Sequence, residues 1–341
     1  MSLAIVILAA GQGTRMKSKM QKILHDVGGK PMVQHAFEAA TAISNQAPVL
    51  VIGPGETGVR ELFGAKARYV VQPEQLGTGH ATQMAQALLQ GHAEQVIVTY
   101  GDMPLLRAES LRRLQETQLT TGAAITMLSA IGDPQSSFGR IVRNKNNDVV
   151  EIVEVAEARQ RPNTAELLAI RELNAGVYCF SAPFLWENID HLPLHKARSG
   201  HEYYLTDMVS IAVNKGLRVT AEIVADAEEC LGAGTRQELV AVEKAFRHRA
   251  NQYWLDNGVT IIDPDTTFID QDVQIGQDTV IWPNTFLQGT SSIGEDCVIG
   301  PNSIIRNSTV GAACRIESAL VEDARVAEAT RVTPFTIVSG Q

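Results

Sequence analysis

The chain has 341 residues, of which 45% are hydrophobic and 20% charged, and its formal net charge is −9. A chain of this length can form two domains, each with its own core. The negative charge disfavours nucleic acid as a partner, because surfaces that bind nucleic acids carry an excess of basic residues. No apolar stretch approaches the roughly 20 residues of a membrane-spanning helix, so we expect no membrane partner.

The cysteines stand apart along the chain, without CxxC spacing or a Cys/His cluster; they are Cys179, Cys230, Cys297 and Cys314. Their isolation argues against a zinc site and is typical of a protein from a reducing cytoplasm. The N-terminal run MSLAIVILAAG has no positive region ahead of its apolar residues. We therefore interpret it as a buried strand and not as a signal peptide.

Residues 1–230 alternate between strand and helix patterns. Several of the strand patterns are continuous apolar runs, which are typical of parallel strands buried on both faces. Pro31 suits the first position of a helix. The segment therefore predicts a doubly wound, Rossmann-like α/β domain that binds ligands beyond the C-terminal ends of its strands. The predicted strands are Ala4–Ala9, Pro48–Ile52, Tyr69–Val71, Gln95–Tyr100 and Ala123–Ser129.

A connecting helix is predicted over residues 231–257. Thr235 and Glu238 have the spacing of a capping box at its start. Asn257 and Gly258 are the residue types that end a helix.

The hydrophobic period becomes six in residues 258–341. The apolar residues at this interval are Ile269, Ile275, Ile281, Leu287, Ile293, Ile299 and Ile305, and Val310, Ile316, Val326, Val332 and Val338 continue the series with small shifts. This period predicts a three-sided parallel β-helix, in which every sixth side chain points inward. Chance spacing of apolar residues is the alternative.

The loop after the first strand, LAAGQGTRMK (residues 8–17), is the first candidate for chemistry. Its glycines allow the backbone to approach a phosphate, and unpaired N–H groups can hold the phosphate oxygens. Arg15 and Lys22 would add positive charge against a triphosphate. The loop matches neither GxGxxG nor a Walker A motif, so a tight strand-to-helix turn remains the alternative to a nucleotide site.

Two further loops follow apolar strands. After Val71, Gly77 and Thr78 suit close packing of a base or ribose, and the amide of Gln72 could read a base edge. Asp102 follows another strand at the position where an α/β enzyme holds Mg²⁺ against phosphates. An ordinary helix start and a helix cap are the structural alternatives for these two loops.

Together these loops resemble those of the sugar-nucleotide pyrophosphorylases, and most closely the bacterial bifunctional N-acetylglucosamine-1-phosphate uridyltransferase/acetyltransferase family. The resemblance covers nearly the whole chain and includes GGKPMVQH (28–35), QLGTGHA (75–81), YGDMPL (100–105), FGRIV (138–142), LNAGVY (173–178) and EYYLTD (202–207). It implies that UTP and N-acetylglucosamine 1-phosphate give UDP-N-acetylglucosamine, a peptidoglycan precursor, and pyrophosphate in the cytoplasm. It also implies a left-handed β-helix that assembles a homotrimer.

The resemblance assigns roles to single residues. Arg15 and Lys22 would hold the UTP phosphates as catalytic residues, and Asp102 would be catalytic and bind Mg²⁺. The residues that would contact the uracil, the ribose and neighbouring parts of the substrates are Leu8, Ala9, Ala10, Gly11, Gln72, Gly77, Thr78, Tyr100 and Gly101. The amino sugar would be held by Gly139, Glu154 and Asn174.

The chain differs from the family pattern at three places. Gln21 replaces a proline before Lys22, and Val155 and Ala156 follow IVE (152–154) where the family usually has a histidine and a lysine. Gly234 stands at the position of an asparagine, the second Mg²⁺ ligand. Its substitute could be water or one of three nearby acidic residues, Asp226, Glu228 and Glu229.

The expected activity leaves alternatives open. The chain ends before the acetyl-transfer residues of the family, so we expect no acetyltransferase activity. A nucleotidyltransferase for another sugar 1-phosphate or another base is one alternative. A degenerate homologue that binds a UDP-sugar with little activity is another, and Gly234 motivates it.

Overall fold

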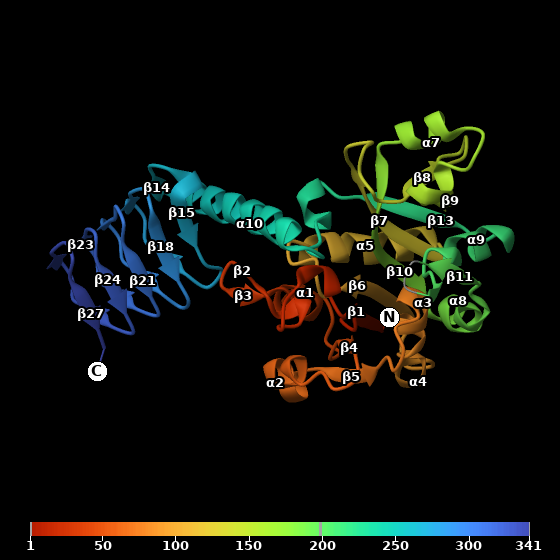
Figure 1. The fold of residues 1–341 in the computed structure, drawn as a ribbon, viewed down its shortest axis with the longest axis horizontal. Helices are drawn as coiled ribbons and strands as arrows, with labels where there is room; N and C mark the ends of the chain where they lie inside the picture. The colour runs from red at the N-terminus through yellow and green to blue at the C-terminus, as the bar shows by residue number, and fades with distance from the viewer. Residues whose placement is uncertain (1, 198–199, 341) are drawn as a thin grey trace. The chain divides into compact units, whose positions relative to one another are not determined.

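The structure, a computed structural model, describes residues 2–197 and 200–340. These residues form two compact units (Figure 1). The first unit contains the chain up to His25 and from Met32 to Arg236, and the second contains Asp26–Pro31 and the chain from Gln237 onward. Within the described residues, no helix is both long enough and apolar enough to span a membrane.

A nine-stranded sheet, counted over the described residues, forms the centre of the first unit. Its middle strand β1 (Leu3–Leu8) is parallel to β4 (Val49–Ile52) on one side and to β6 (Gln95–Tyr100) on the other. The sheet continues beyond β4 with β5 (Arg68–Val71). On the other side, it continues with β10 (Glu172–Ser181), β7 (Ile125–Ile131), β13 (Val219–Ile223), β8 (Arg140–Arg143) and β9 (Val149–Val153).

The predicted doubly wound α/β domain is confirmed, and each predicted strand forms with its ends within two residues of the expected positions. The expected helical position of Pro31 is wrong. This residue pairs in the hairpin of β2 (Asp26–Val27) and β3 (Lys30–Pro31), and α1 begins at the next residue.

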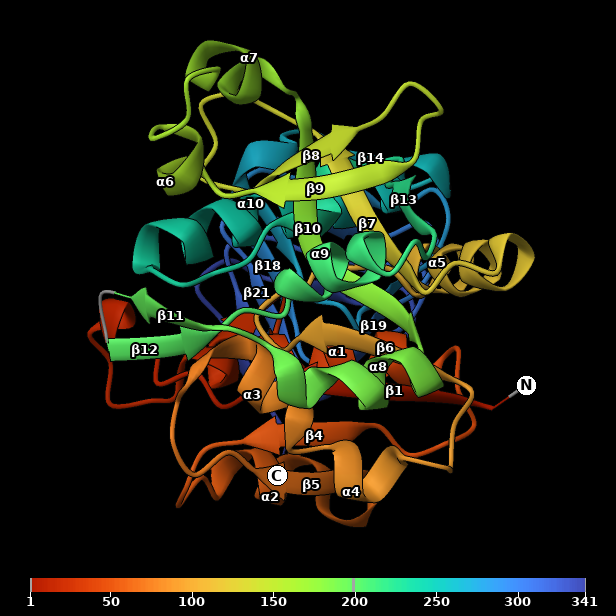
Figure 2. The same ribbon diagram turned by 90° about the vertical axis from the view of Figure 1, so that its right-hand side faces the viewer.

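Helices cover both faces of the sheet. Figure 2 views the sheet from the face that carries α3, α8 and α9. The helices of the first unit are α1 (Met32–Thr41), α2 (Gly58–Phe63), α3 (Gly77–Gln83), α4 (Gln86–Leu89), α5 (Ala108–Thr121), α6 (Val155–Ala158), α7 (Thr164–Ala169), α8 (Ala182–Asn188) and α9 (Asp207–Asn214). A separate hairpin joins β11 (Leu194–Ala197) to β12 (Gly200–Tyr203).

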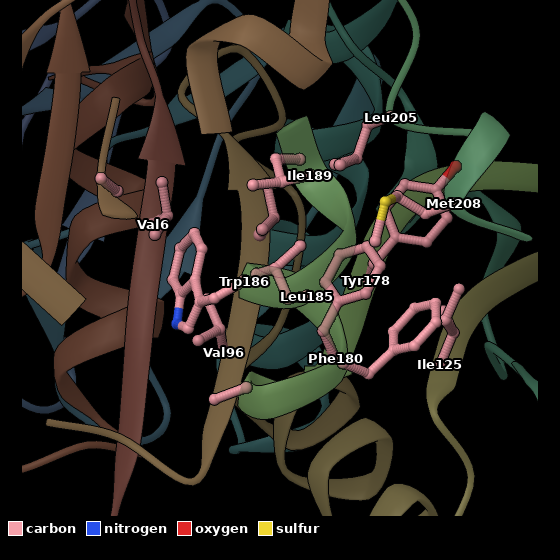
Figure 3. Close-up of a cluster of buried hydrophobic side chains, with 14 of the residues drawn as sticks. Val6, Val96, Ile125, Tyr178, Phe180, Leu185, Trp186, Ile189, Leu205 and Met208 are labelled. Atoms are coloured by element: carbon pink, nitrogen blue, oxygen red, sulfur yellow. The ribbon is translucent and has the colours of Figure 1, made fainter. Parts of the chain in front are cut away.

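The alternating side chains of β1 enter two cores. Val6 joins Val96 and Trp186 in one buried cluster (Figure 3), and Ile7 joins Val33 and other side chains in the cluster on the opposite face. This burial on both faces explains why β1 is apolar without interruption. Polar side chains and backbone groups that contact a ligand can therefore be exposed beyond the ends of the strands.

Apart from Arg236, α10 (Arg236–Asp256) belongs to the second unit, and the chain after it forms a left-handed parallel β-helix (Figure 1). Its short strands stack into three parallel sheets, and the residues at the six-residue interval are buried inside, except for the partly buried Val338. Val321, which the periodic series omitted, is fully buried between Ile316 and Val326. The strands are β14 (Thr260–Ile261), β15 (Thr267–Ile269), β16 (Gln274–Ile275), β17 (Val280–Ile281), β18 (Thr285–Gln288), β19 (Ser292–Ile293), β20 (Val298–Ile299), β21 (Ile304–Arg306), β22 (Thr309–Val310), β23 (Arg315–Ile316), β24 (Leu320–Glu322), β25 (Arg325–Val326), β26 (Arg331–Val332) and β27 (Ile337–Ser339).

Glycines follow the inward Ile275, Ile293 and Ile299, and at the first two of these glycines the neighbouring coil approaches closely. A Cβ atom on Gly276 would lie 2.5 Å from the backbone nitrogen of Glu295, and one on Gly294 would lie 2.6 Å from that of Ala312. Only glycine fits this approach without displacing the backbone.

Ile305→Ala tests the inward packing of the β-helix. Ile305 is fully buried, and its truncation leaves a cavity, so we expect the free energy of unfolding to fall by about 2–5 kcal/mol. Urea unfolding followed by circular dichroism measures the change. The control Ile262→Ala removes a side chain that is 50% exposed in the same unit and should cost less than about 1 kcal/mol. Equal losses in the two variants would contradict the packing.

Candidate functional site

The ends of β1, β5 and β6 surround a cavity of about 710 Å³ in the first unit. Ligands of doubly wound sheets bind at this kind of position, where the chain order reverses on either side of a central strand. Glu202 and Tyr204, which the sequence reasoning did not select as site residues, also line the cavity. The predicted site residues that it brings together are Leu8, Ala9, Ala10, Gly11, Lys22, Gln72, Gly77, Thr78, Tyr100 and Asp102.

The loop after β1 turns sharply at Gly13, whose φ is +60°. A Cβ atom there would lie 2.5 Å from the Cβ of Lys22, so the close approach of the two segments also requires glycine. Met16 is buried and anchors the following turn, whereas Arg15 is exposed and lies outside the cavity lining. The geometry therefore places Lys22 in the cavity and Arg15 on the exposed part of the same loop.

Lys22 and Asp102 form an ion pair through Nζ and Oδ2. Both side chains are mostly buried, at 16% and 21% exposure, so each compensates the charge of the other. Gly101 donates its N–H to the carbonyl oxygen of Leu8 at 3.0 Å and continues the strand pairing up to Asp102. Gly101 is thus a structural neighbour of the cavity and does not line it.

The loop after β5 is held in shape by polar contacts. Gln72 is buried, and its Nε2 donates to the carbonyl oxygen of Gly77 at 3.1 Å and lies 3.2 Å from Nδ1 of His80. Gly77 has a φ of +90°, and a Cβ atom there would lie 2.6 Å from the carbonyl oxygen of Tyr203. The Oγ1 of Thr78 accepts the N–H of Leu205 at 3.1 Å. Nδ1 of His80 also lies 3.0 Å from the carbonyl oxygen of Glu74, so the imidazole lies between the backbone of this loop and the Gln72 amide.

Gly139, Glu154 and Asn174 lie outside this lining but close to one another. Asn174 donates its N–H to the carbonyl oxygen of Gly139 at 2.9 Å, and a Cβ atom on Gly139 would lie 3.1 Å from Oε1 of Glu154. Asn174 also donates through Nδ2 to the hydroxyl of Tyr178 at 2.8 Å, which fixes its amide. These three predicted sugar-binding residues therefore form one group.

Tyr100 connects this group to the cavity. Burial raises the pKa of its hydroxyl, and the nearby carboxylates of Asp102 and Glu154 raise that pKa further. The pKa of Glu154 is itself raised by burial, with a smaller contribution from the charge of Glu157. Tyr100 is thus neutral and within the electrostatic reach of both carboxylates.

Gln21, which replaces the family proline, keeps a backbone that proline could adopt. Its φ is −57° and its ψ is 137°, and proline restricts φ to about −65°. Its side chain donates to the carbonyl oxygen of Ala9 at 3.2 Å. A hydrogen bond therefore secures the loop where a ring would otherwise restrict it.

Two of the acidic residues near Gly234 contact residues at the start of α5. Asp226 pairs with Arg107 at 3.0 Å, and the buried Glu229 accepts the hydroxyl of Ser110 at 2.7 Å. Across residues 2–197 and 200–340, no cluster of three or more His, Cys, Asp or Glu side chains could hold a metal ion. Mg²⁺ often binds through one or two carboxylates together with substrate phosphates and water, so Asp102 alone fits such a cation.

Two family models match the chain. The MobA-like NTP transferase domain matches residues 5–199, and the bacterial transferase hexapeptide (six repeats) matches residues 272–307. The first model covers the residues that line the cavity except Glu202 and Tyr204, and the second covers the central coils of the β-helix.

Curated relatives match nearly the whole chain. A bifunctional protein GlmU from Exiguobacterium sibiricum is 42% identical over 97% of this chain and 72% of its own length. The GlmU proteins of Caldanaerobacter subterraneus and Clostridium perfringens are also 42% identical, over 98% and 99% of this chain and 71% and 73% of their own lengths. A solved structure of CMP:2-keto-3-deoxy-manno-octonic acid synthetase with CTP matches with a TM-score of 0.53. It is 19% identical, covers 74% of this chain and all of its own, and supports the fold alone.

Glu154→Gln tests the electrostatics of the site. Partial desolvation raises the pKa of Glu154 above its ordinary 4.5, so the ionised carboxylate destabilises the fold slightly at neutral pH. The effect is small because the side chain is exposed and water screens its charge. This cost disappears as the pH falls through the raised pKa. We expect the variant to melt at a higher temperature than the parent at about pH 7.5, and the difference to shrink at about pH 4.

Differential scanning fluorimetry at the two pH values measures the effect. Glu166→Gln, which changes an exposed glutamate on α7, is the control and should leave the melting temperature unchanged at both. A Glu154→Gln variant that melts below the parent at neutral pH would contradict the assignment.

Proposed function

Because the chain belongs to the GlmU family of bifunctional proteins, we propose that it transfers UMP from UTP to N-acetylglucosamine 1-phosphate and releases pyrophosphate. The chain is a nucleotidyltransferase of the UDP-N-acetylglucosamine pyrophosphorylase type. The observation that carries the proposal is the meeting of Lys22, Asp102, Gln72 and the glycine loop around one cavity.

The proposed reaction is an in-line displacement at the α-phosphorus of UTP. A phosphate oxygen of the sugar 1-phosphate forms the new P–O bond, and the bond to pyrophosphate breaks. The attacking oxygen is already anionic at neutral pH, so alignment and charge compensation replace a general base. Lys22 and Arg15 would hold phosphate oxygens. A divalent cation at Asp102, for which we propose Mg²⁺, would neutralise charge on the leaving pyrophosphate.

Lys22 would change partners when UTP binds. Its Nζ pairs with Asp102 in the structure. A triphosphate carries more negative charge than one carboxylate and would attract Nζ more strongly. Asp102 would then be free to bind the cation that accompanies the nucleotide. The ion pair thus keeps both groups in place before the substrate arrives.

The orientation of Gln72 favours uracil over cytosine. Its Nε2 is engaged by the carbonyl oxygen of Gly77, so Oε1 remains as the acceptor of the amide. Uracil presents N3–H as a donor, whereas N3 of cytosine is an acceptor and would face this oxygen without a hydrogen bond. A base that leaves a buried polar group unpaired binds less tightly, and this loss of affinity is an effective source of specificity.

The sugar specificity is proposed from Glu154 and Asn174. The exposed carboxylate of Glu154 can accept hydrogen bonds from sugar hydroxyls. The amide of Asn174, which donates to Tyr178 and accepts the N–H of Gly176 at 3.0 Å, has one further N–H and one further lone pair. These groups suit an amino sugar, and N-acetylglucosamine 1-phosphate is the substrate that we propose. Another sugar 1-phosphate is the alternative.

An assay of pyrophosphate release tests the activity. With UTP, Mg²⁺ and a panel of sugar 1-phosphates, we expect the fastest release with N-acetylglucosamine 1-phosphate. Faster release with another sugar would replace the proposed substrate. Binding of UDP-sugars without release from any substrate would support a degenerate homologue.

Asp102→Asn tests the metal and charge assignment. The variant keeps the size of the side chain but loses its charge, so we expect turnover to fall by at least about 100-fold while nucleotide binding is partly retained. Calorimetry measures the binding. Asp323→Asn, at an exposed turn of the second unit, is the control and should leave turnover unchanged. Unchanged turnover in Asp102→Asn would refute the assignment.

We also propose a homotrimer formed through the β-helix. The sheet that contains β18 and β21 presents an outward apolar row of adjacent side chains, namely Phe268, Phe286, Ile304, Leu320 and Ile337. Such a row is a candidate for burial between subunits. The expected lack of acetyl transfer remains a prediction, which an acetyl-transfer assay of this chain would test.

Light scattering tests the assembly. We expect a mass about three times the chain's 36.9 kDa, because a closed trimer would bury the apolar row. Ile304→Asp, which places a charge in this row, should reduce the mass to that of one chain. A parent protein that is monomeric at micromolar concentration would contradict the proposal.

A further inference from the structure

Two glutamine side chains hold consecutive carbonyl groups just beyond the end of β1. Nε2 of Gln21 donates to the carbonyl oxygen of Ala9 at 3.2 Å, and Nε2 of Gln75 donates to that of Ala10 at 2.5 Å. The two glutamines come from different segments, one beside Lys22 and the other from the loop after β5. Both bonds therefore link the nucleotide loop to parts of the chain that are distant in sequence.

These bonds begin where the strand pairing ends. The N–H of Gly101 reaches the carbonyl oxygen of Leu8 at 3.0 Å, and the N–H of Ala9 reaches that of Val51 at 2.8 Å. Beyond these two bonds, β4 and β6 no longer provide partners for β1. The glutamine amides thus extend the support of the backbone by two peptide groups.

A fixed carbonyl group also fixes the N–H group of the next residue. The peptide unit is planar and trans, so its N–H points away from its C=O. Gln21 therefore sets the direction of the N–H of Ala10, and Gln75 sets that of Gly11. Each N–H points away from the glutamine that holds its peptide plane.

The two N–H groups are free to bind a ligand. In the part of the chain that the structure describes, neither Ala10 nor Gly11 donates its N–H to another group. Ala10 is only 4% exposed, and a buried N–H without a partner is costly, which indicates an acceptor supplied from outside the chain. Both residues line the cavity, and a Cβ atom on Gly11 would lie 3.9 Å from Nζ of Lys22.

Gln21 is itself oriented by a second contact. Its side chain also hydrogen-bonds the carboxylate of Glu56, and that carboxylate accepts the N–H of Gly53 at 3.0 Å. Gly53 directly follows β4, so these contacts connect the ends of two adjacent strands. The amide nitrogen of Gln21 is therefore held by two acceptors, the carbonyl oxygen of Ala9 and the carboxylate of Glu56.

We propose that Gln21 and Gln75 are positioning residues that direct the N–H groups of Ala10 and Gly11 toward oxygen atoms of a bound nucleoside triphosphate. The identity of the nucleotide as UTP rests on the proposed function. The donors lie beside Lys22, so the bound oxygens belong to the nucleotide and not to the sugar phosphate.

Calorimetric titration of UTP into Gln21→Met and Gln75→Met tests the proposal. Methionine has about the length of glutamine but cannot hold the carbonyl group, so the N–H group is no longer fixed. We expect the Kd for UTP to rise about tenfold in each variant, as expected when the geometry of one such hydrogen bond is lost. In turnover, the rise should appear in the KM for UTP and leave the KM for the sugar phosphate unchanged.

Gln86→Met is the matched control. Nε2 of Gln86 also donates to a distant carbonyl group, that of Trp186 at 3.3 Å, but the residue does not line the cavity. Its UTP affinity should equal that of the parent. A UTP Kd within twofold of the parent in Gln21→Met and Gln75→Met would show that the amides are only structural and would overturn the proposal.

The titration is separate from the test of the proposed function because it needs no sugar phosphate and no turnover. A parent that binds UTP but releases no pyrophosphate refutes the proposed activity and leaves the positioning role open to this measurement. CTP, ATP and GTP are titrated alongside, so that the variants are compared on the nucleotide that the parent prefers. A parent that binds none of the four would overturn the positioning proposal as well.

Discussion

The parallel pairing of β1 with both β4 and β6 is the constraint on which the site depends. It directs the C-terminal ends of these strands to one edge of the sheet, where loops from distant parts of the sequence meet. The apolar side chains of β1 fill two cores and provide the stability that allows polar groups to gather at the edge. The glycines of the first loop then bring the backbone close to Lys22.

Charge compensation within the cavity follows from this arrangement. Lys22 and Asp102 approach from different loops, and each would carry an uncompensated charge in a mostly buried position without the other. The same two groups are suited to a polyanion and its accompanying cation. Glu154, by contrast, is exposed, and partial desolvation raises its pKa, as is common for residues of binding sites.

The sequence predicted the features that depend on local or periodic patterns. The period of six identified the β-helix because each coil repeats the same geometry, and the apolar runs identified the central strands. Contacts between distant segments left no such pattern. The bond from Gln75 to Ala10 spans 65 residues, and the position of Tyr204 in the cavity depends on the packing of a hairpin end. Val321 escaped the series because the spacing of the inward residues changes near it.

A crystal structure with UTP bound would test the central claim most directly. We expect the nucleotide to lie between the loop after β1 and the loop after β5, with the base against Gln72. We also expect Nζ of Lys22 to have left Asp102 and to contact phosphate oxygens. A nucleotide bound elsewhere, or an intact pair of Lys22 and Asp102 in the complex, would contradict the proposed site.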